Sequence, residues 1–287
     1  MVAFTDETTA DLRSLIEADF GPLRADAELW RDVLYDWLNY RARLIPRQPR
    51  EVIFSEQVKA HLSSQPAISE IAAVLRTGGD VSPWLSERVR RRKDDPKADL
   101  MFNDWQISHF HLGRVFDRPE RVKRSGPLLF AYINPARAVL LDVQPHNSWA
   151  MQSLLRTLLH TSPADMNTEI RGILPEPPMS DDQLLMLRKK GVNVTINIDG
   201  RPFLPPGLAL ATSGAAFRTV RLGDNVRIML DEAREKLASN SLAPSQMAKV
   251  AGSIGVPVRL GLRFDGSTFY AHEKNRKLDL IRSSPLT

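Results

Sequence analysis

The 287-residue sequence contains no cysteine. The chain can therefore form no disulfide bond, and it cannot build a thiolate-ligated metal centre. Long apolar stretches are also absent, because no window approaches the roughly 18 uninterrupted apolar residues of a membrane-spanning helix. The N-terminal stretch carries Asp6, Glu7 and Asp11 and lacks the apolar core of a signal peptide. We therefore expect a cytoplasmic protein that does not associate with membranes.

The motifs of several common enzyme classes are missing as well. The sequence has no phosphate loop ending in Gly-Lys-Ser/Thr, no dinucleotide fingerprint, no H-E-x-x-H motif and no Gly-x-Ser-x-Gly motif. Residues 207–214 are rich in small side chains but contain no lysine, so we expect a loop there. These absences argue against nucleotide hydrolysis, hydride transfer and serine-hydrolase chemistry, and we expect no cofactor.

The composition is typical of a folded globular chain. Hydrophobic residues make up 43% of the sequence and charged residues 25%, which is ordinary for a protein with a core. The length is compatible with roughly two domains. A net charge of +5 favours a polyanionic partner. The basic residues gather in two runs, at 88–97 and 114–124.

Hydrophobic periodicity and turn signals predict an α+β protein built from three segments. We expect an N-terminal helical region over residues 1–98, a central antiparallel sheet with a helix over residues 99–172, and a small C-terminal α+β domain over residues 180–287.

Local signals place the elements of the two outer segments. Helical spacing, with Ser55 as an N-cap and Gly78 as a stop, predicts N-terminal helices at residues 26–40, 55–62, 67–76 and 85–92. In the C-terminal segment, capping and Asp-Gly turn signals predict a helix beginning with a Ser180–Gln183 capping box, a strand at 192–198, a helix at 224–237 and a hairpin at 258–271.

The central segment contains four of the six histidines: His109, His111, His146 and His160. Alternating hydrophobicity predicts a strand at 105–112, a hairpin formed by 128–133 and 138–143, and a helix at 149–160. Residues two apart on a strand point to the same side, about 6.6 Å apart. His109 and His111 therefore share a face, and the hairpin delivers His146 just past its second strand.

This histidine cluster is the only constellation in the sequence that resembles a catalytic site. Histidine exchanges a proton near neutral pH because its unperturbed pKa is about 6.5. Next to the cluster lies a basic run, whose members we expect to bind nucleic-acid phosphates: Arg114, Arg118, Arg121 and Lys123. Arg124 is a candidate to stabilise negative charge in a transition state.

The first chemistry that fits these residues is metal-independent cleavage of RNA. One imidazole among His109, His111 and His146 acts as general base towards a ribose 2′-hydroxyl, and another protonates the departing 5′-oxygen. The cations Arg124 or Lys123 hold the extra negative charge on phosphorus.

Two other readings stay open. The same three histidines offer three neutral nitrogens to zinc or a similar ion, with Asp104 or Asp142 as a further ligand or as a partner of a ligand, which would make the protein a metal-dependent hydrolase. Alternatively the histidines are structural core residues, and the basic run makes the protein a non-enzymatic nucleic-acid-binding module. We expect a structural role for His160, which lies near a predicted helix C-terminus, and for the isolated His61 and His272.

The stretch R-S-G-P-L-L-F-A-Y-I at 124–133, followed by A-V-L-L-D-V-Q-P-H at 138–146, resembles the hairpin of RelE/ParE-like ribonuclease toxins. The resemblance covers about 65 of the 287 residues. It implies a twisted antiparallel sheet packed on helices, RNA as substrate, and basic and proton-transfer residues on the exposed face of the sheet, where Arg124 and His146 match such roles. Those toxins are much shorter, and they have no H-x-H strand.

Together these patterns predict a metal-independent endoribonuclease in a bacterial toxin or phage-defence setting. RNA is the expected partner, with an inhibitory antitoxin protein as a candidate second partner. The catalytic residues are expected to be His109, His111, His146 and Arg124.

Overall fold

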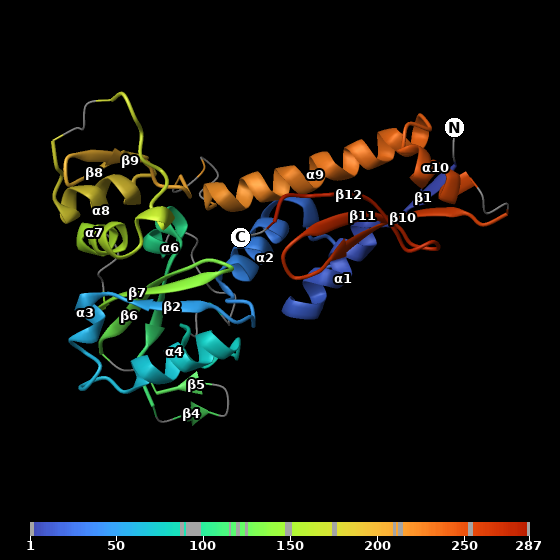
Figure 1. Ribbon diagram of the computed structural model, residues 1–287. Coiled ribbons are helices and arrows are strands. Elements are labelled where there is room, and N and C mark those ends of the chain that lie inside the picture. Colours follow the sequence, from blue (N-terminus) through green and yellow to red (C-terminus); the bar gives the residue numbers. More distant parts are fainter. Residues whose placement is uncertain are drawn as a thin grey trace. The chain divides into compact units, whose positions relative to one another are not determined.

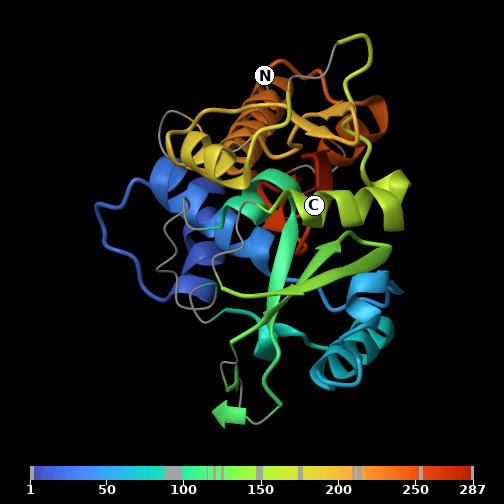
Figure 2. The same cartoon turned by 90° about the vertical axis from the view of Figure 1, so that its left-hand side faces the viewer.

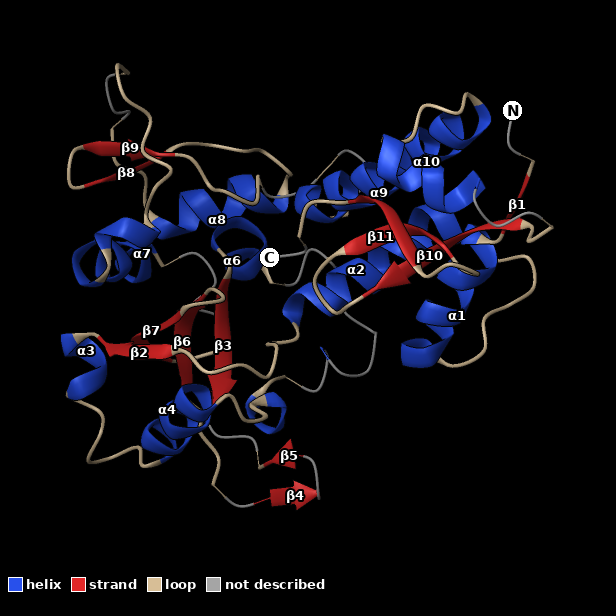
Figure 3. Ribbon diagram, turned by 45° about the vertical axis from the view of Figure 1, so that its right-hand side comes forward, coloured by secondary structure: helices blue, strands red, loops and turns tan. Residues whose placement is uncertain are grey.

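The computed structural model describes residues 3–86, 89, 99–114, 116–118, 121–123, 126–146, 151–173, 177–208, 211, 215–251 and 255–285. Helices and strands are interspersed along the chain, and the fold is of the mixed α+β class expected from the sequence (Figure 3). The chain divides into two compact units. Unit 1 contains residues 1–38 and 219–287, and unit 2 contains residues 39–218. Unit 2 is thus inserted between the two segments of unit 1.

Unit 1 is organised around a four-stranded sheet in the order β1-β10-β11-β12. The short β1 pairs in parallel with β10, and the other neighbours are antiparallel. The elements assigned wholly or mainly to this unit are β1 (Phe4–Asp6), α1 (Thr8–Phe20), the π-helical turn η1 (Leu29–Val33), α9 (Phe217–Ala238), α10 (Pro244–Ala251), β10 (Val258–Phe264), β11 (Phe269–Glu273) and β12 (Leu278–Arg282).

The core of unit 1 joins this sheet to its helices through aromatic packing. Trp37, in α2 (Leu34–Arg43), is fully buried and meets Phe264 and Phe269 edge-on, at ring-centroid distances of 5.4 and 5.9 Å. The indole N–H of Trp37 donates to Asp19 at 2.7 Å, so that its polar end is satisfied as well.

Unit 2 contains the central hairpin and the histidines. Its elements are β2 (Glu51–Phe54), α3 (Glu56–Lys59), α4 (Ala67–Thr77), η2 (Ser82–Trp84), α6 (Leu100–Trp105), β3 (Ile107–His111), β4 (Phe116–Arg118), β5 (Arg121–Val122), β6 (Leu128–Ile133), β7 (Arg137–Gln144), α7 (Gln152–Thr161), η3 (Pro163–Asp165), α8 (Asp181–Lys189), β8 (Ile196–Ile198) and β9 (Arg201–Phe203).

The main sheet of unit 2 has the strand order β2-β7-β6-β3. The hairpin β6–β7 forms as the sequence predicts, and β3 adds to it antiparallel. The sheet is mixed rather than purely antiparallel, because β2 joins β7 in parallel. The cyan α4 and the yellow-green α7 lie on opposite faces of the green strands (Figures 1 and 2).

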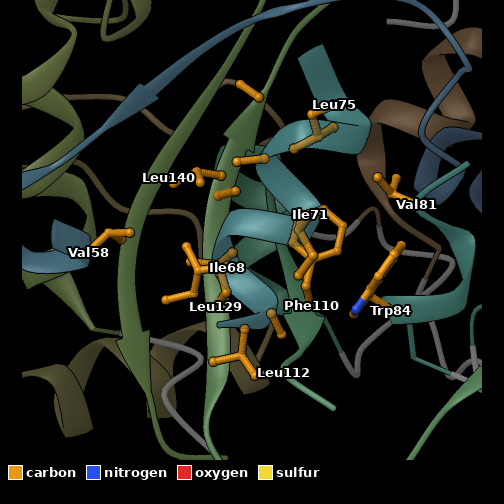
Figure 4. Close-up of a cluster of buried hydrophobic side chains, with 14 of the residues drawn as sticks. Val58, Ile68, Ile71, Leu75, Val81, Trp84, Phe110, Leu112, Leu129 and Leu140 are labelled. Carbon is orange, nitrogen blue, oxygen red and sulfur yellow. The ribbon is translucent and has the colours of Figure 1, made fainter. Parts of the chain in front are cut away.

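Each face of this sheet is covered by its own hydrophobic core. One face packs against α3, α4 and η2, and Figure 4 shows the resulting cluster, which includes Ile71, Phe110 and Leu129. The other face packs against α6, α7, α8 and the β8–β9 hairpin.

Several local predictions are confirmed. Ser55 caps α3, accepting the Val58 N–H at 3.0 Å, and Gly78 ends α4 in the left-handed conformation. The Ser180–Gln183 capping box is present at the start of α8. The Asp199–Gly200 turn joins β8 to β9, with positive φ at both residues.

Other elements differ from the prediction. The expected strand at 105–112 begins only at Ile107, because residues 100–105 form α6 under an Asp99 cap. The helix expected at 224–237 already begins at Phe217. Strands β1, β2 and β12 were not predicted. The boundaries of the two compact units differ from those of the three expected segments. Strand β2 shares a sheet with the central hairpin, and residues 180–218 belong to unit 2.

Within the part of the chain that the structure describes, no helix combines the length and apolar character needed to traverse a bilayer.

Candidate active site

The three histidines of the predicted cluster meet at one end of the unit 2 sheet. In the β3–β6 pairing, His109 lies opposite Phe130. His111, the last residue of β3, lies opposite Leu128, the first residue of β6. Leu128 in turn pairs with Gln144, where β7 ends. His146 follows two residues later. Since directly paired residues share a face of the sheet, the register of β3, β6 and β7 brings His111 close to His146, and His109 lies two residues back along β3.

The distances define the cluster, which we call the histidine cluster (His109, His111 and His146). The ring centroids of His111 and His146 are 5.6 Å apart, and those of His109 and His111 are 6.4 Å apart.

The exposure of the three rings is graded. His146 is exposed, whereas the side chain of His109 is only 10% accessible and His111 is 4% accessible. Of the three described imidazoles, His146 is therefore the one that meets solvent directly.

Asp99 is a member of the site that sequence reasoning missed. Its Oδ1 accepts the Phe102 N–H at 3.1 Å and so caps α6, while its Oδ2 lies 3.5 Å from Nδ1 of His109. At this distance the carboxylate lies within ion-pair reach of a protonated His109. The available signal was an aspartate directly before the apolar helix Leu100-Met101-Phe102, which is a typical N-cap position.

The basic residues of the predicted phosphate-binding run occupy different situations. Arg114 is exposed and forms an ion pair with Glu70 of α4 at 2.7 Å. Lys123 is exposed and Arg121 is half-buried. The backbone of Arg118 lies in β4, but its side chain and all of Arg124 lie outside the described residues.

Gly113 connects the basic run to the histidine cluster. It follows His111 by two residues, and a Cβ atom at this position would lie 1.9 Å from the carbonyl oxygen of Lys123. Only glycine permits this backbone approach. The close contact holds the end of β3 against the segment that carries Lys123.

The two aspartates considered as metal partners are engaged elsewhere. Asp104 is buried and forms an ion pair with Arg188, with Oδ2 and Nε 2.6 Å apart. Asp142 accepts the Val143 N–H and a hydrogen bond from the Gln144 amide. Among the described residues there is no group of three or more His, Asp or Glu side chains arranged to hold a metal ion.

The spacing of the rings also disfavours a shared tetrahedral ion. With metal–nitrogen bonds of about 2.0–2.1 Å, two imidazoles on one tetrahedral ion have ring centroids within roughly 5 Å of each other. The 6.4 Å between His109 and His111 exceeds this limit.

His160 does not join the cluster. It lies near the C-terminal end of α7 and is 64% exposed, with its Nε2 2.8 Å from Oδ2 of Asp199 in the β8–β9 turn. Arg156 binds the same carboxylate at 2.9 Å. The two residues fasten the turn to α7, which agrees with the structural role expected for His160.

Comparison of the chain with protein-family models, with curated protein sequences and with solved structures yields no match.

Proposed function

We propose that unit 2 cleaves RNA by metal-independent general acid–base catalysis at the histidine cluster. The observation that carries this proposal is the convergence of three imidazoles and one carboxylate, Asp99, at the end of one sheet. Proton donors and acceptors that titrate near pH 7 are the groups this reaction requires.

His111 and His146 are the proposed acid–base pair. A catalytic nitrogen must come within about 2.6–3.2 Å of the oxygen whose proton it moves. In this proposal one ring, 5.6 Å from the other, reaches the ribose 2′-oxygen, and the other reaches the 5′-oxygen of the adjacent phosphate. The exposure of His146 supports an approach of the substrate from that side.

The proposed reaction proceeds in one displacement. The basic imidazole removes the proton of a ribose 2′-hydroxyl, and the 2′-oxygen forms a bond to the adjacent phosphorus. The bond from phosphorus to the 5′-oxygen of the next nucleotide breaks, and the acidic imidazole supplies the proton to that oxygen. The products are a 2′,3′-cyclic phosphate and a 5′-hydroxyl, and the two histidines have exchanged protonation states.

His109 has a different part in this proposal. The Asp99 carboxylate favours its charged form, so the ring supplies positive charge next to the reacting pair. Positive charge aimed at the phosphate stabilises the additional negative charge of the transition state. Lys123 and Arg124 remain the candidate side chains for direct contact with the phosphate.

RNA as the substrate is supported by the distribution of charge. Residues 39–218 contain 25 Lys and Arg against 18 Asp and Glu, a net charge of +7, whereas the residues of unit 1 contain 14 against 16, a net charge of −2. The entire positive excess belongs to the unit with the histidine cluster. Such an excess attracts a polyanion and makes its binding dependent on salt.

The resemblance of the β6–β7 hairpin region to RelE/ParE-like toxins agrees with this substrate. An inhibitory antitoxin protein and a toxin or phage-defence setting belong to the same proposal. Both follow from the resemblance alone.

The test is incubation of the purified full-length protein with end-labelled RNA, with and without a chelator. We expect cleavage in both arms, and a 2′,3′-cyclic phosphate at the new end. RNA with a 2′-deoxy nucleotide at the cleaved position should resist, because it lacks the attacking oxygen. His111→Ala and His146→Ala should each lower the rate by about 10²–10⁴-fold, while His160→Ala should retain it.

Other outcomes would replace the proposal with one of its rivals. Loss of cleavage in chelator would point to a metal-dependent hydrolase. Salt-sensitive RNA binding without cleavage, unaffected by the histidine substitutions, would identify a non-enzymatic binding module.

A further inference from the structure

We propose that the buried ion pair between Asp104 and Arg188 is a positioning device that fixes α6 so that Asp99 stays against His109. The effect on cleavage rests on the proposed function. The effect on His109 itself does not, and it is measurable without any activity.

The N-terminal end of α6 lies next to the histidine cluster, because Asp99, which caps the helix, is 3.5 Å from His109. Asp99 uses one carboxylate oxygen to cap the helix and the other to face His109. The distance between carboxylate and imidazole therefore depends on where the first turn of α6 lies.

The C-terminal end of α6 is held by two neighbours. Arg188 of α8 binds Asp104 near the C-terminal end of α6. Its Nη1 also lies 4.0 Å from the sulfur of Met101, in the first turn of α6. The Gly207 N–H donates to the carbonyl of Asp104 at 2.9 Å. A Cβ atom on Gly207 would lie 1.5 Å from the carbonyl oxygen of Asn103, so the backbones of the two segments are in direct contact.

The helix is too short to hold a position by itself. It has six residues, whereas an isolated helix shorter than about 12–15 residues is marginal in water. Only Gln106, in the left-handed conformation with φ 58°, separates α6 from β3. A shift of α6 is therefore transmitted over one residue to the strand that carries His109 and His111.

The Asp104–Arg188 pair is suited to setting this position. The side chains are only 1% and 2% accessible, so neither charge can turn to water. An ion pair removed from water is tolerated only when its geometry is good. Burial raises the pKa of Asp104 to about 6 and outweighs the lowering effect of Arg188.

The experiment follows the titration of His109 by NMR in the full-length protein between about pH 5 and 8. The resonance is identified by its loss in His109→Gln. Asp99→Asn sets the reference, because asparagine still caps the helix while the negative charge is removed. We expect this variant to lower the titration midpoint of His109 by about 0.5–1 unit.

The double variant Asp104→Asn/Arg188→Met replaces both buried charges at once. We expect it to lower the His109 midpoint towards the value of Asp99→Asn and to reduce kcat about tenfold with little change in KM. The matched control is Arg156→Met, which removes the exposed arginine of the α7 pair and should leave the midpoint unchanged.

An unchanged midpoint in the double variant, or an equal shift in Arg156→Met, would overturn the proposal. If the double variant fails to fold, Arg188→Lys takes its place, since lysine keeps the charge but loses the planar fork. An unchanged His109 midpoint in Arg188→Lys would then overturn the proposal. Absence of RNA cleavage in the wild-type protein would refute the proposed function, and the midpoint would still decide the role of the ion pair.

Discussion

At the scale of single residues, glycine positions determine how closely the segments around the candidate site approach one another. Gly113 lets the end of β3 lie against Lys123, and Gly207 lets a loop lie against α6. Neither Gly113 nor Gly207 has a positive φ, so the close approach of another backbone segment, rather than the backbone conformation, explains the need for glycine.

Replacing Gly113 with alanine tests this contact. The added Cβ would lie 1.9 Å from the Lys123 carbonyl oxygen, so one of the two backbone segments must move. We expect a loss of about 1–3 kcal/mol in the free energy of unfolding, measured by urea denaturation, and slower RNA cleavage. Gly126→Ala is the matched control, because no heavy atom lies within 4 Å of its added Cβ. Equal stability of the two variants would contradict this explanation.

The identity of the histidine cluster could be read from the sequence for a local reason. Two histidines at alternate strand positions share a face by geometry, and the hairpin that delivers His146 is short and has clear turn signals. The role of Asp99 could not be read in the same way. Its contact with His109 depends on the turn from α6 into β3, which the alternation of residues 105–112 concealed.

At the scale of elements, side-chain caps fix where several helices begin. In α8 the Ser180 hydroxyl accepts the Gln183 N–H at 3.2 Å, and the Gln183 side chain accepts the Ser180 N–H at 2.9 Å. This cap matters beyond the helix itself, because α8 supplies Arg188 to the buried ion pair.

Removal of the cap should therefore weaken unit 2. We expect Ser180→Ala to lower the free energy of unfolding by about 0.5–2 kcal/mol, whereas Ser180→Asn, which keeps an acceptor at the N-cap, should cost much less. Thermal or urea unfolding of the two variants measures the difference. A similar loss in both would mean that the hydroxyl contributes something other than capping.

Elements with a cap or a tight turn were predicted, whereas strands β1 and β2, whose partners lie far along the chain, were not. Caps and Asp-Gly turns located α3, α4, α8 and two hairpins. The helix expected at 55–62 is shortened to Glu56–Lys59, and the strand expected at 192–198 to Ile196–Ile198. Strand β2 has only four residues, and its partner β7 lies more than 80 positions later. Its pairing depends on tertiary packing, which periodicity within a short window does not report.

At the scale of the whole molecule, the two units differ in net charge, which is −2 for unit 1 and +7 for unit 2. Unit 1 contains an ionic network in which Glu7 binds Arg259 and Lys274, and Lys274 also binds Asp11. The network joins the start of α1 to the sheet. Hydrogen bonds from Arg259 and Lys274 lower the pKa of Glu7 to about 2.

This shift predicts how stability depends on pH. A carboxyl group whose pKa is lower in the folded than in the unfolded state stabilises the fold above its unfolded pKa, about 4.3. That contribution is lost as the pH falls from there through about 2. We therefore expect Glu7→Gln to be less stable than the wild type at pH 7 and the difference to shrink below pH about 4.

Chemical denaturation at a series of pH values measures this difference. Asp26→Asn is the control, because its ion pair with Arg24 is largely exposed and such pairs contribute little. A difference between wild type and Glu7→Gln that persists undiminished at pH about 2 would contradict the assignment.

The parallel pairing of β1 with β10 places Phe4 next to Val258. During synthesis at about 5–20 residues per second, the first strand emerges from the ribosome roughly 10–50 s before its partner exists. Unit 2, by contrast, finds all the strand partners of its main sheet within residues 51–144. We therefore expect the inserted unit to complete its sheet on the nascent chain first, while β1 remains unpaired until β10 has been synthesised.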